Sequence, residues 1–157
     1  MKIVFLDEAS FSLNGDMDYR TIQRFGDLET FVNLPGSELA SRAGDAEIAV
    51  VNKYYVGAAQ MDAMPKLKHI AVIATGTNNV DLPEARKRGI RVTNVSGYGR
   101  FTVPQQAFTL ILNLAGQVHR YITDVWNGDW AQAPTFTLLR YPTFELAGKT
   151  IGIIGFG

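Results

Sequence analysis

Polar and glycine residues follow four apolar runs in this sequence, and together they have the chemistry to bind a small anion. They are Asp7, Asn52, Lys53, residues 75–79 and residues 94–97. A loop of small and polar residues exposes backbone N–H groups, and a lysine beside such a loop favours a negatively charged ligand. The sequence therefore predicts an anion-binding site, provided that the fold brings these loops together.

The two histidines are weaker candidates for chemistry. His69 begins an apolar run, at the end opposite to the polar loop, and His119 lies in the middle of a predicted helix. A lone histidine in either position is usually structural or solvated, and an acid such as Asp7 at the end of a first strand commonly orders neighbouring loop amides. Because the chain has no cysteine, it has no thiolate nucleophile, cysteine metal site or disulfide. We therefore assign no catalytic residue and no metal ligand within residues 1–157.

The overall composition is that of an ordinary globular chain. Its 15 basic and 15 acidic residues cancel, which removes any general electrostatic argument for binding nucleic acid or an anionic membrane. The apolar run at residues 3–6 is too short for a signal peptide, and no stretch approaches the length of a membrane span. We therefore expect a soluble, cytoplasmic protein with one domain and part of another.

Apolar runs and helix-like segments alternate from residue 1 to residue 95. The run at 70–74 is apolar without alternation, which predicts a strand buried on both faces. Ser37 and Asp81 are expected to cap the helices that follow them. Strands are expected at 3–6, 28–33, 47–51, 69–74 and 90–95, and helices at 19–25, 38–43, 57–64 and 82–88.

Such alternation implies right-handed crossovers and a parallel sheet with helices on both faces. We expect an α/β fold, namely a flavodoxin-like, doubly wound five-stranded parallel sheet in the order 2-1-3-4-5, with residues 28–33 at an edge. In an open sheet of this kind, ligands bind at the carboxyl ends of the strands. That edge would gather the four polar loops into one site.

The pattern changes after residue 100. An apolar stripe at helical spacing runs from 103 to 125, which predicts a helix of roughly 35 Å that begins with a capping box of Thr102 and Gln105. Nothing in the first 95 residues needs so long an apolar face, so we expect the helix to pack on a second domain, on another subunit, or on both. The stripe consists of Val103, Ala107, Leu110, Ile111, Leu114, Val118, Ile122 and Val125.

Residues 131–144 follow, and their prolines and aromatic side chains predict an extended arm. These aromatic residues would either bury a large area on a partner or cover their own domain. Residues 145–157 are then expected to form a strand that runs into the first half of a dinucleotide-binding fingerprint, with Gly155 at the tight turn and Gly157 beside the pyrophosphate. The alternative for this segment is an edge strand with a flexible glycine tail.

Six segments carry a resemblance to a known family, and they keep its order and approximate spacing. They include ATGTNNVD at 74–81, GIRVTNVSGY at 89–98 and ELAGKTIGIIG at 145–155, together with residues 3–9, 51–53 and 65–68. The chain resembles the N-terminal portion of the D-isomer-specific 2-hydroxyacid dehydrogenases, most of all their glycerate dehydrogenase (hydroxypyruvate reductase) branch. The resemblance implies a substrate-binding domain at 1–100 and the start of an NAD-binding Rossmann domain at 101–157, truncated at its end.

The resemblance also implies roles for particular residues. The backbone amides of Gly76, Thr77 and Asn78 would hold the substrate carboxylate, and the loop with Asn52 and Lys53 would approach the substrate. Along the dinucleotide, the corresponding residues would be Thr75, Val103, Gly155 and Gly157. Many relatives have an acidic residue and a histidine where this chain has Gln105 and Gln106, which argues against an ionic role there.

The implied reaction moves a hydride between NAD(H) and a small D-2-hydroxy acid or 2-keto acid, with glycerate and hydroxypyruvate as the first choice. The family's catalytic arginine, glutamate and histidine belong to segments beyond residue 157, so we expect residues 1–157 to be inactive alone. We also expect a homodimer formed through the long helix and the arm. The residues leave open which acid is used and whether NADP replaces NAD.

Two other classes share the alternating architecture. A phospho-acceptor receiver domain would need an aspartate after the third strand and a lysine after the fifth, but Asn52 and Asn94 stand there. A non-catalytic module for small-molecule binding or dimerisation, with the same flavodoxin-like fold, is the second alternative. In that case the long helix and the arm would serve only to join two copies.

Overall fold

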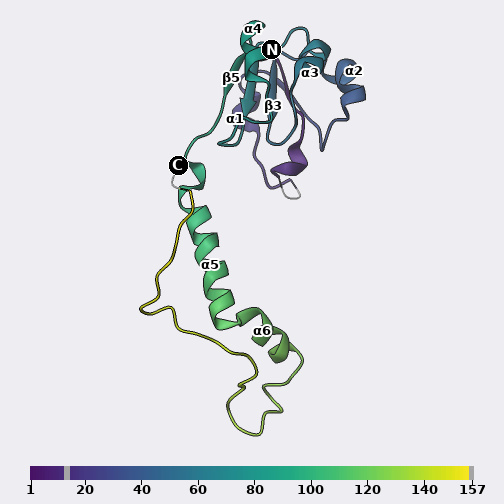
Figure 1. The fold of residues 1–157 in the computed structure, drawn as a ribbon. Helices are drawn as coiled ribbons and strands as arrows, with labels where there is room; N and C mark the ends of the chain where they lie inside the picture. Colours follow the sequence, from purple (N-terminus) through teal and green to yellow (C-terminus); the bar gives the residue numbers. More distant parts are fainter. Residues whose placement is uncertain (13–14, 156–157) are drawn as a thin grey trace. The chain divides into compact units, whose positions relative to one another are not determined.

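A computed structural model describes residues 1–12 and 15–155 of the chain (Figure 1). The chain divides into two compact units, Met1–Tyr98 and Gly99–Gly157. Asn14, which we expected in the first loop, and Gly157 lie outside the described residues. None of the helices in the described ranges is long and apolar enough to cross a membrane.

The first unit contains one parallel sheet. Its order is β2-β1-β3-β4-β5, and each neighbouring pair is parallel, which confirms the predicted flavodoxin-like arrangement with the second strand at an edge. The strands are short, with three or four residues each, and the three central ones carry most of the buried residues. They are β1 (Lys2–Phe5), β2 (Asp27–Thr30), β3 (Ile48–Val51), β4 (His69–Val72) and β5 (Arg91–Thr93).

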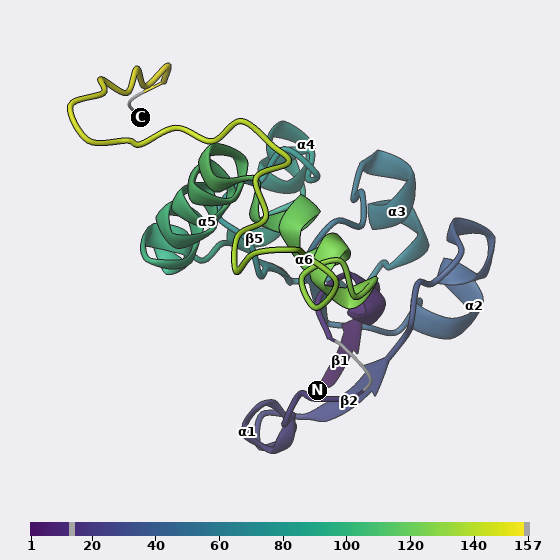
Figure 2. The same ribbon diagram turned by 90° about the horizontal axis from the view of Figure 1, so that it is seen from below.

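Four short helices connect these strands, and three of them cover the same face of the sheet. They are α1 (Arg20–Gln23), α2 (Leu39–Ala43), α3 (Ala58–Ala63) and α4 (Leu82–Lys87), with 3-10 turns η1 (Glu8–Ser10), η2 (Gly36–Glu38) and η3 (Tyr98–Arg100). The main core joins Leu39, Met61 and Ala85 of α2, α3 and α4 to Val4 and Ile70 of the sheet. Figure 2 shows α2 and α3 lying side by side over this face.

The opposite face of the sheet is less covered than predicted. Ile3, Phe5 and Val50 are buried there, but Ala71 and Ile73 are only half-buried. Among the described elements of the first unit, only α1 packs on this face, through Ile22 and the neighbouring loop. The prediction that the run at 70–74 is buried on both faces is therefore wrong for one of them. An apolar run shows that its side chains favour burial, but it does not show that a helix is present to cover them.

Helix ends in the first unit follow local capping chemistry in one case and not in another. The Asp81 carboxylate accepts a hydrogen bond from the Glu84 backbone N–H at 3.0 Å, which confirms the predicted cap of α4. The predicted cap at Ser37 is wrong, because Ser37 lies inside η2 and α2 begins only at Leu39. The tighter 3-10 turn places Glu38 at the N-cap position, where its side chain makes no capping bond.

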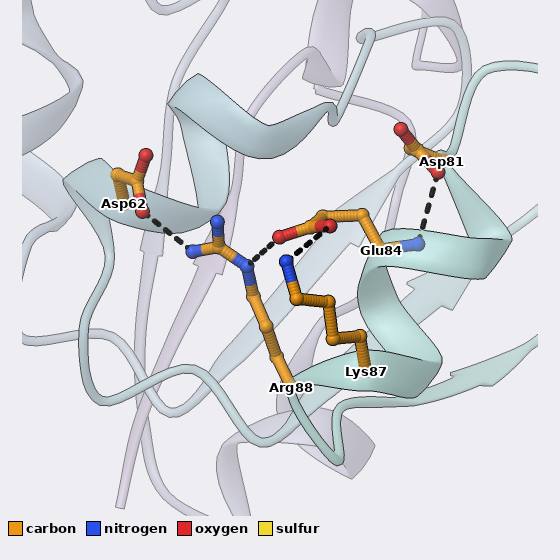
Figure 3. Close-up of polar contacts among 5 residues, drawn as sticks. All are labelled: Asp62, Asp81, Glu84, Lys87 and Arg88. Carbon is orange, nitrogen blue, oxygen red and sulfur yellow. Dashed lines mark hydrogen bonds and ion pairs between the residues drawn. The ribbon is translucent and has the colours of Figure 1, made fainter.

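An ion-pair network joins α3 to the end of α4 (Figure 3). Arg88 donates from Nη1 to Asp62 Oδ1 at 2.6 Å and from Nε to Glu84 Oε1 at 2.7 Å. Lys87 Nζ lies 3.6 Å from Glu84 Oε2. The hydrogen bond from Arg88 lowers the pKa of Glu84, and the hydrogen bonds to Asp62 and Glu84 raise the pKa of Arg88. These exposed pairs orient two short helices, although solvent screens their contribution to stability.

The second unit contains two helices where one was predicted. They are α5 (Thr102–Gly116) and α6 (Val118–Trp126), separated by Gln117 in the left-handed conformation with φ of 52°. The expected 35 Å helix is therefore wrong. Gly116 weakens the helix at this point, and Gln117 Nε2 satisfies the freed carbonyl of Leu114 at 2.9 Å. The apolar stripe continues in sequence through the break, which is why its spacing did not reveal it.

The predicted capping box at the start of α5 is also absent. Phe101 occupies the N-cap position, and Thr102 is already helical, so no side chain caps this end. Because Thr102 lies one residue inside the helix, its hydroxyl cannot reach the N–H groups that a capping residue would satisfy. Thr109 Oγ1 instead donates to the Gln105 carbonyl within the helix at 2.8 Å.

The chain after α6 continues without helix or strand, as the predicted arm requires. It is held to α6 by Tyr141, whose hydroxyl donates to Asp124 Oδ1 at 3.0 Å and whose ring lies under the Arg120 guanidinium at 3.9 Å. The Phe144 backbone N–H donates to the Ala115 carbonyl at 3.2 Å. The arm therefore packs in part on its own unit.

The expected strand near the end of the chain is not formed. Residues 145–155 pair with no other strand in the described part of the chain, and Ile151, Ile153 and Ile154 are exposed. A strand needs a neighbouring strand to complete its hydrogen bonds and a packed layer to cover its side chains. An apolar sequence alone does not supply those neighbours.

Candidate anion-binding site

Asp7 organises the loop that follows β3. Its carboxylate is 3% exposed, and Oδ1 accepts from the Asn52 N–H at 2.9 Å. Oδ2 accepts from the N–H groups of Lys53 at 2.6 Å and of Tyr54 at 2.9 Å, and from Ser10 Oγ at 3.0 Å. Asp7 therefore serves the loop amides, as expected of an acid at the end of the first strand, and both of its oxygens are occupied.

The loop after β4 exposes unused backbone donors. Within the described ranges, the N–H groups of Gly76, Thr77 and Asn78 donate no hydrogen bond, whereas the Thr77 carbonyl accepts from Val80 N–H at 3.0 Å. Gly76 and Asn78 are exposed to solvent. Consecutive N–H groups without acceptors form a concave, positively polarised surface that suits a carboxylate or phosphate. This loop is the strongest feature of the site.

The loops after β3 and β4 are joined by side-chain and backbone hydrogen bonds. Asn79 Nδ2 donates to the carbonyls of Tyr54 at 3.0 Å and Asn52 at 3.4 Å. The Val56 N–H donates to the Asn79 carbonyl at 2.8 Å, and a parallel bridge pairs Val56 with Val80. The structure therefore brings Lys53 and the Gly76–Asn78 amides to the same edge of the sheet.

The loop after β5 lies against the same edge. Asn94 Nδ2 donates to the Thr75 carbonyl at 2.7 Å, and Thr75 Oγ1 donates to the Val95 carbonyl at 3.0 Å. These bonds fix the backbone on which the Gly76 amide depends. The Thr75 hydroxyl proton is used within the protein, so its oxygen is left to accept a hydrogen bond from a ligand.

A pocket of about 410 Å³ opens between the ends of β1 and β3, where the strand order reverses and ligands bind in sheets of this class. Sequence reasoning anticipated its residues at the ends of these two strands but missed Ser10 and Asn33. The signal for both was a polar residue shortly after a strand. The pocket is lined by Asp7, Ala9, Ser10, Val32, Asn33, Lys53 and Tyr54.

Two charged side chains line this pocket, Asp7 and Lys53, and the Asp7 carboxylate already accepts the hydrogen bonds described above. Lys53 is exposed and makes no ion pair or side-chain hydrogen bond with the described residues, so its ammonium group is available to an anion. Asn52 is less available, because its Nδ2 donates to the Ser10 carbonyl at 2.9 Å and to Ser10 Oγ at 3.0 Å. Burial, and to a lesser extent the charge of Asp7, raises the pKa of Tyr54.

Neither histidine belongs to this site. His69 lies at the amino end of β4, and its Nε2 is 2.8 Å from Thr93 Oγ1. Burial, followed by the charge of Arg91, lowers the pKa of His69, which favours the neutral ring in this contact. His119 Nδ1 lies 2.7 Å from Asn113 Oδ1 in the second unit. Within the described ranges, no group of histidine and acidic side chains is arranged to hold a metal ion.

Most of the chain matches the model of one known protein family. The model of the D-isomer specific 2-hydroxyacid dehydrogenase catalytic domain matches residues 3–124. The chain belongs to this family. The match also decides against the phospho-acceptor alternative, which the residues after β3 and β5 already opposed.

Curated relatives support the same 2-hydroxyacid dehydrogenase assignment along the entire chain. The hydroxypyruvate reductase of Blautia hydrogenotrophica is 35% identical over 161 aligned positions, which cover 100% of this chain and 49% of the relative. The glycerate dehydrogenase of Methylorubrum extorquens is 35% identical over 160 positions, which cover 99% of this chain and 49% of that protein. The chain therefore spans about half the length of the curated relatives it matches.

Solved structures agree on the fold. The TT0316 protein from Thermus thermophilus is 28% identical, with a TM-score of 0.71 over 83% of this chain and 42% of that chain. The D-lactate dehydrogenase of Escherichia coli is 22% identical, with a TM-score of 0.73 over 96% of this chain and 47% of that chain. At these identities the structures support the architecture and leave the substrate undecided.

The dehydrogenase family implies a dinucleotide, but the described residues do not by themselves form its cradle. Gly155 has the positive φ of 94° that a tight turn requires, yet the segment before it forms no strand. Val103 is 67% exposed on α5, Thr75 belongs to the other unit, and Gly157 lies outside the described residues. No chemical step through a dinucleotide can be built on these residues alone.

Proposed function

We propose that the chain is the N-terminal part of an oxidoreductase that transfers a hydride between NAD(H), or NADP(H), and a small D-2-hydroxy acid or 2-keto acid. The observation that carries the proposal is the row of three unpartnered amides at Gly76, Thr77 and Asn78, in a loop that Asn79 ties to the loop of Lys53. The similarity to a hydroxypyruvate reductase and a glycerate dehydrogenase makes glycerate and hydroxypyruvate the first candidates.

Within this proposal, each residue of the site has a separate task. The three amides hold the substrate carboxylate, because they present N–H dipoles without competing acceptors. Lys53 attracts the anion and neutralises part of its charge. Asn52 offers a ligand only its side-chain oxygen, because its Nδ2 is bonded to Ser10.

The proposed division of labour assigns residues 1–100 to substrate binding and residues 101–157 to the start of the NAD-binding domain. The hydride chemistry itself is supplied by the nicotinamide when it is bound. Thr75, Val103, Gly155 and Gly157 are the residues proposed to contact the dinucleotide. A cysteine-free chain is compatible with a reducing compartment, so the cytoplasm is the proposed location.

Residues 1–157 alone are expected to show no turnover, because the site contains no arginine and no histidine that could polarise the substrate carbonyl or exchange its proton. The purified chain is mixed with NADH and hydroxypyruvate, or with NAD and D-glycerate, and NADH absorbance is followed. A rate above the no-protein background would contradict this expectation.

Binding of the acid by residues 1–157 is the direct test of the proposed site. Hydroxypyruvate or D-glycerate is expected to shift the amide NMR signals of Gly76, Thr77 and Asn78, with a Kd of about 1 mM, which corresponds to roughly −4 kcal/mol. Glycerol is the matched control, because it has the same three carbons without a carboxylate. The proposed site is wrong if the acids and glycerol have the same effect on these signals.

We also propose that two copies pair through α5, α6 and the arm. Large apolar side chains remain exposed along both helices, and the described parts of the second unit do not cover them. Leu110 and Leu114 are 53% and 60% exposed, and Ile122 and Val125 are 49% and 55% exposed. Exposed apolar area of this extent marks an interaction surface, and a second copy is the partner that the proposal selects.

A further inference from the structure

Asp7 is a buried acid without a basic partner. It forms no ion pair with any described residue, although buried carboxylates usually pair with a cation. Its charge is satisfied by the N–H groups of Asn52, Lys53 and Tyr54, and the Ser10 hydroxyl shares its proton between the Asp7 carbonyl at 2.7 Å and Oδ2 at 3.0 Å. Three consecutive amides converge on one carboxylate, so one side chain holds the backbone of the loop after β3 in place.

The loop at 52–54 also holds the side chain of Asn79 by hydrogen bonds. The carbonyls of Asn52 and Tyr54 accept from Asn79 Nδ2, while the N–H groups of these two residues donate to Asp7. The N–H groups and the carbonyl groups of Asn52 and Tyr54 are therefore all hydrogen-bonded. Asn79 directly follows the three free amides, and its carbonyl is held by the Val56 N–H at 2.8 Å. An unbroken series of hydrogen bonds runs from Asp7 to the anion-binding loop.

We propose that Asp7 is a positioning residue for the carboxylate-binding amides, acting through the loop at 52–54 and through Asn79. This inference rests on the proposed function, because the amides that Asp7 orders are those proposed to bind the substrate carboxylate. Unpaired amides bind an anion well only if their N–H groups already point to one place, since ordering them at the moment of binding costs free energy. Asp7 supplies that order because both of its oxygens are already bonded to donors of the loop at 52–54.

A carboxylate is required for this role, and an amide of the same shape cannot replace it. Asp7 uses both oxygens as acceptors, Oδ1 for one amide and Oδ2 for two amides and a hydroxyl. In Asp7→Asn one of these positions becomes an NH₂ group that points at N–H donors. At least one loop amide would then lose its acceptor and turn away.

The test compares Asp7→Asn with the neighbouring Glu8→Gln in the 157-residue chain. Glu8→Gln removes the same charge one residue away, and its side-chain oxygen can still accept from the Tyr19 hydroxyl, which lies 2.8 Å from Glu8 Oε1. In Asp7→Asn we expect faster hydrogen exchange at one or more of Asn52, Lys53 and Tyr54, greater backbone mobility at Gly76–Asn78 by NMR relaxation, and an affinity for oxalate about tenfold weaker. Glu8→Gln should match the wild-type chain in all three measurements.

Asn79→Ala keeps the inference testable if Asp7→Asn does not fold. It removes only the second half of the hydrogen-bond series, so the amides of Lys53 and Tyr54 should stay protected while Gly76–Asn78 become mobile and oxalate binds more weakly. The inference is overturned if either variant leaves both the mobility of Gly76–Asn78 and the oxalate affinity unchanged. If the wild-type chain does not bind oxalate, the proposed function fails, and the mobility of Gly76–Asn78 in the unliganded variants still decides the role of Asp7.

Discussion

Replacing Ile70 by alanine is expected to lower the free energy of unfolding of the first unit by about 2–5 kcal/mol. Ile70 is 0% exposed at the centre of β4, where it pairs with Ala49 of β3 and Val92 of β5. Its side chain belongs to the main core that joins the sheet to α2, α3 and α4. Because protein cores are close-packed, the neighbours of Ile70 relax only partly into the cavity that the substitution leaves.

Hydrogen exchange of the β-strand amides is the suitable measurement, because both tryptophans belong to the second unit and their fluorescence would not report on the sheet. Ile153→Ala is the matched control, since Ile153 is 73% exposed and the same atoms are removed. The control should change stability by less than about 0.5 kcal/mol. Equal effects of the two substitutions would mean that the sheet does not have the core described above.

The sheet and its carboxyl edge were predictable because they depend on local sequence patterns. An apolar run followed by a polar, glycine-containing loop indicates where a buried strand ends, and parallel strands end at the same edge. Residues 75–79 and Lys53 could therefore be assigned to one site before their contacts were known. The cap at Asp81 was equally local, because the side chain and the amide it caps are three residues apart.

Features that depend on distant partners were not predictable in this way. The bonds from Asn79 to the loop at 52–54 join residues more than 20 positions apart, and no sequence pattern marks them. Gln117 interrupts a helix within a continuous apolar stripe, because a single left-handed residue changes the backbone and leaves the spacing of side chains intact. Residues 151–155 are apolar, but a strand also requires neighbours to complete its ladder.

Substitutions on the apolar face of α5 are expected to prevent the chain from forming a dimer. Leu110 and Leu114 lie one helical turn apart on the predicted stripe and are both exposed by more than half. If a second copy covers them, the 157-residue chain should sediment as a dimer at micromolar concentration. If the proposed function holds, the part of the relatives that this chain does not span is the competing occupant of this face, and the 157-residue chain would then be monomeric or non-specifically aggregated.

Leu110→Glu combined with Leu114→Glu is expected to raise the dimer Kd by about 100-fold, because burying two unpaired carboxylates at an apolar contact costs about 3 kcal/mol or more. Gln105→Glu combined with Thr109→Glu is the matched control, since it adds the same charges to α5 at polar positions on another face. Sedimentation velocity over a range of concentrations gives both dissociation constants, and circular dichroism checks that α5 remains helical. A wild-type chain that is monomeric throughout, or a control that dissociates as readily as the leucine variant, would rule out pairing through this face.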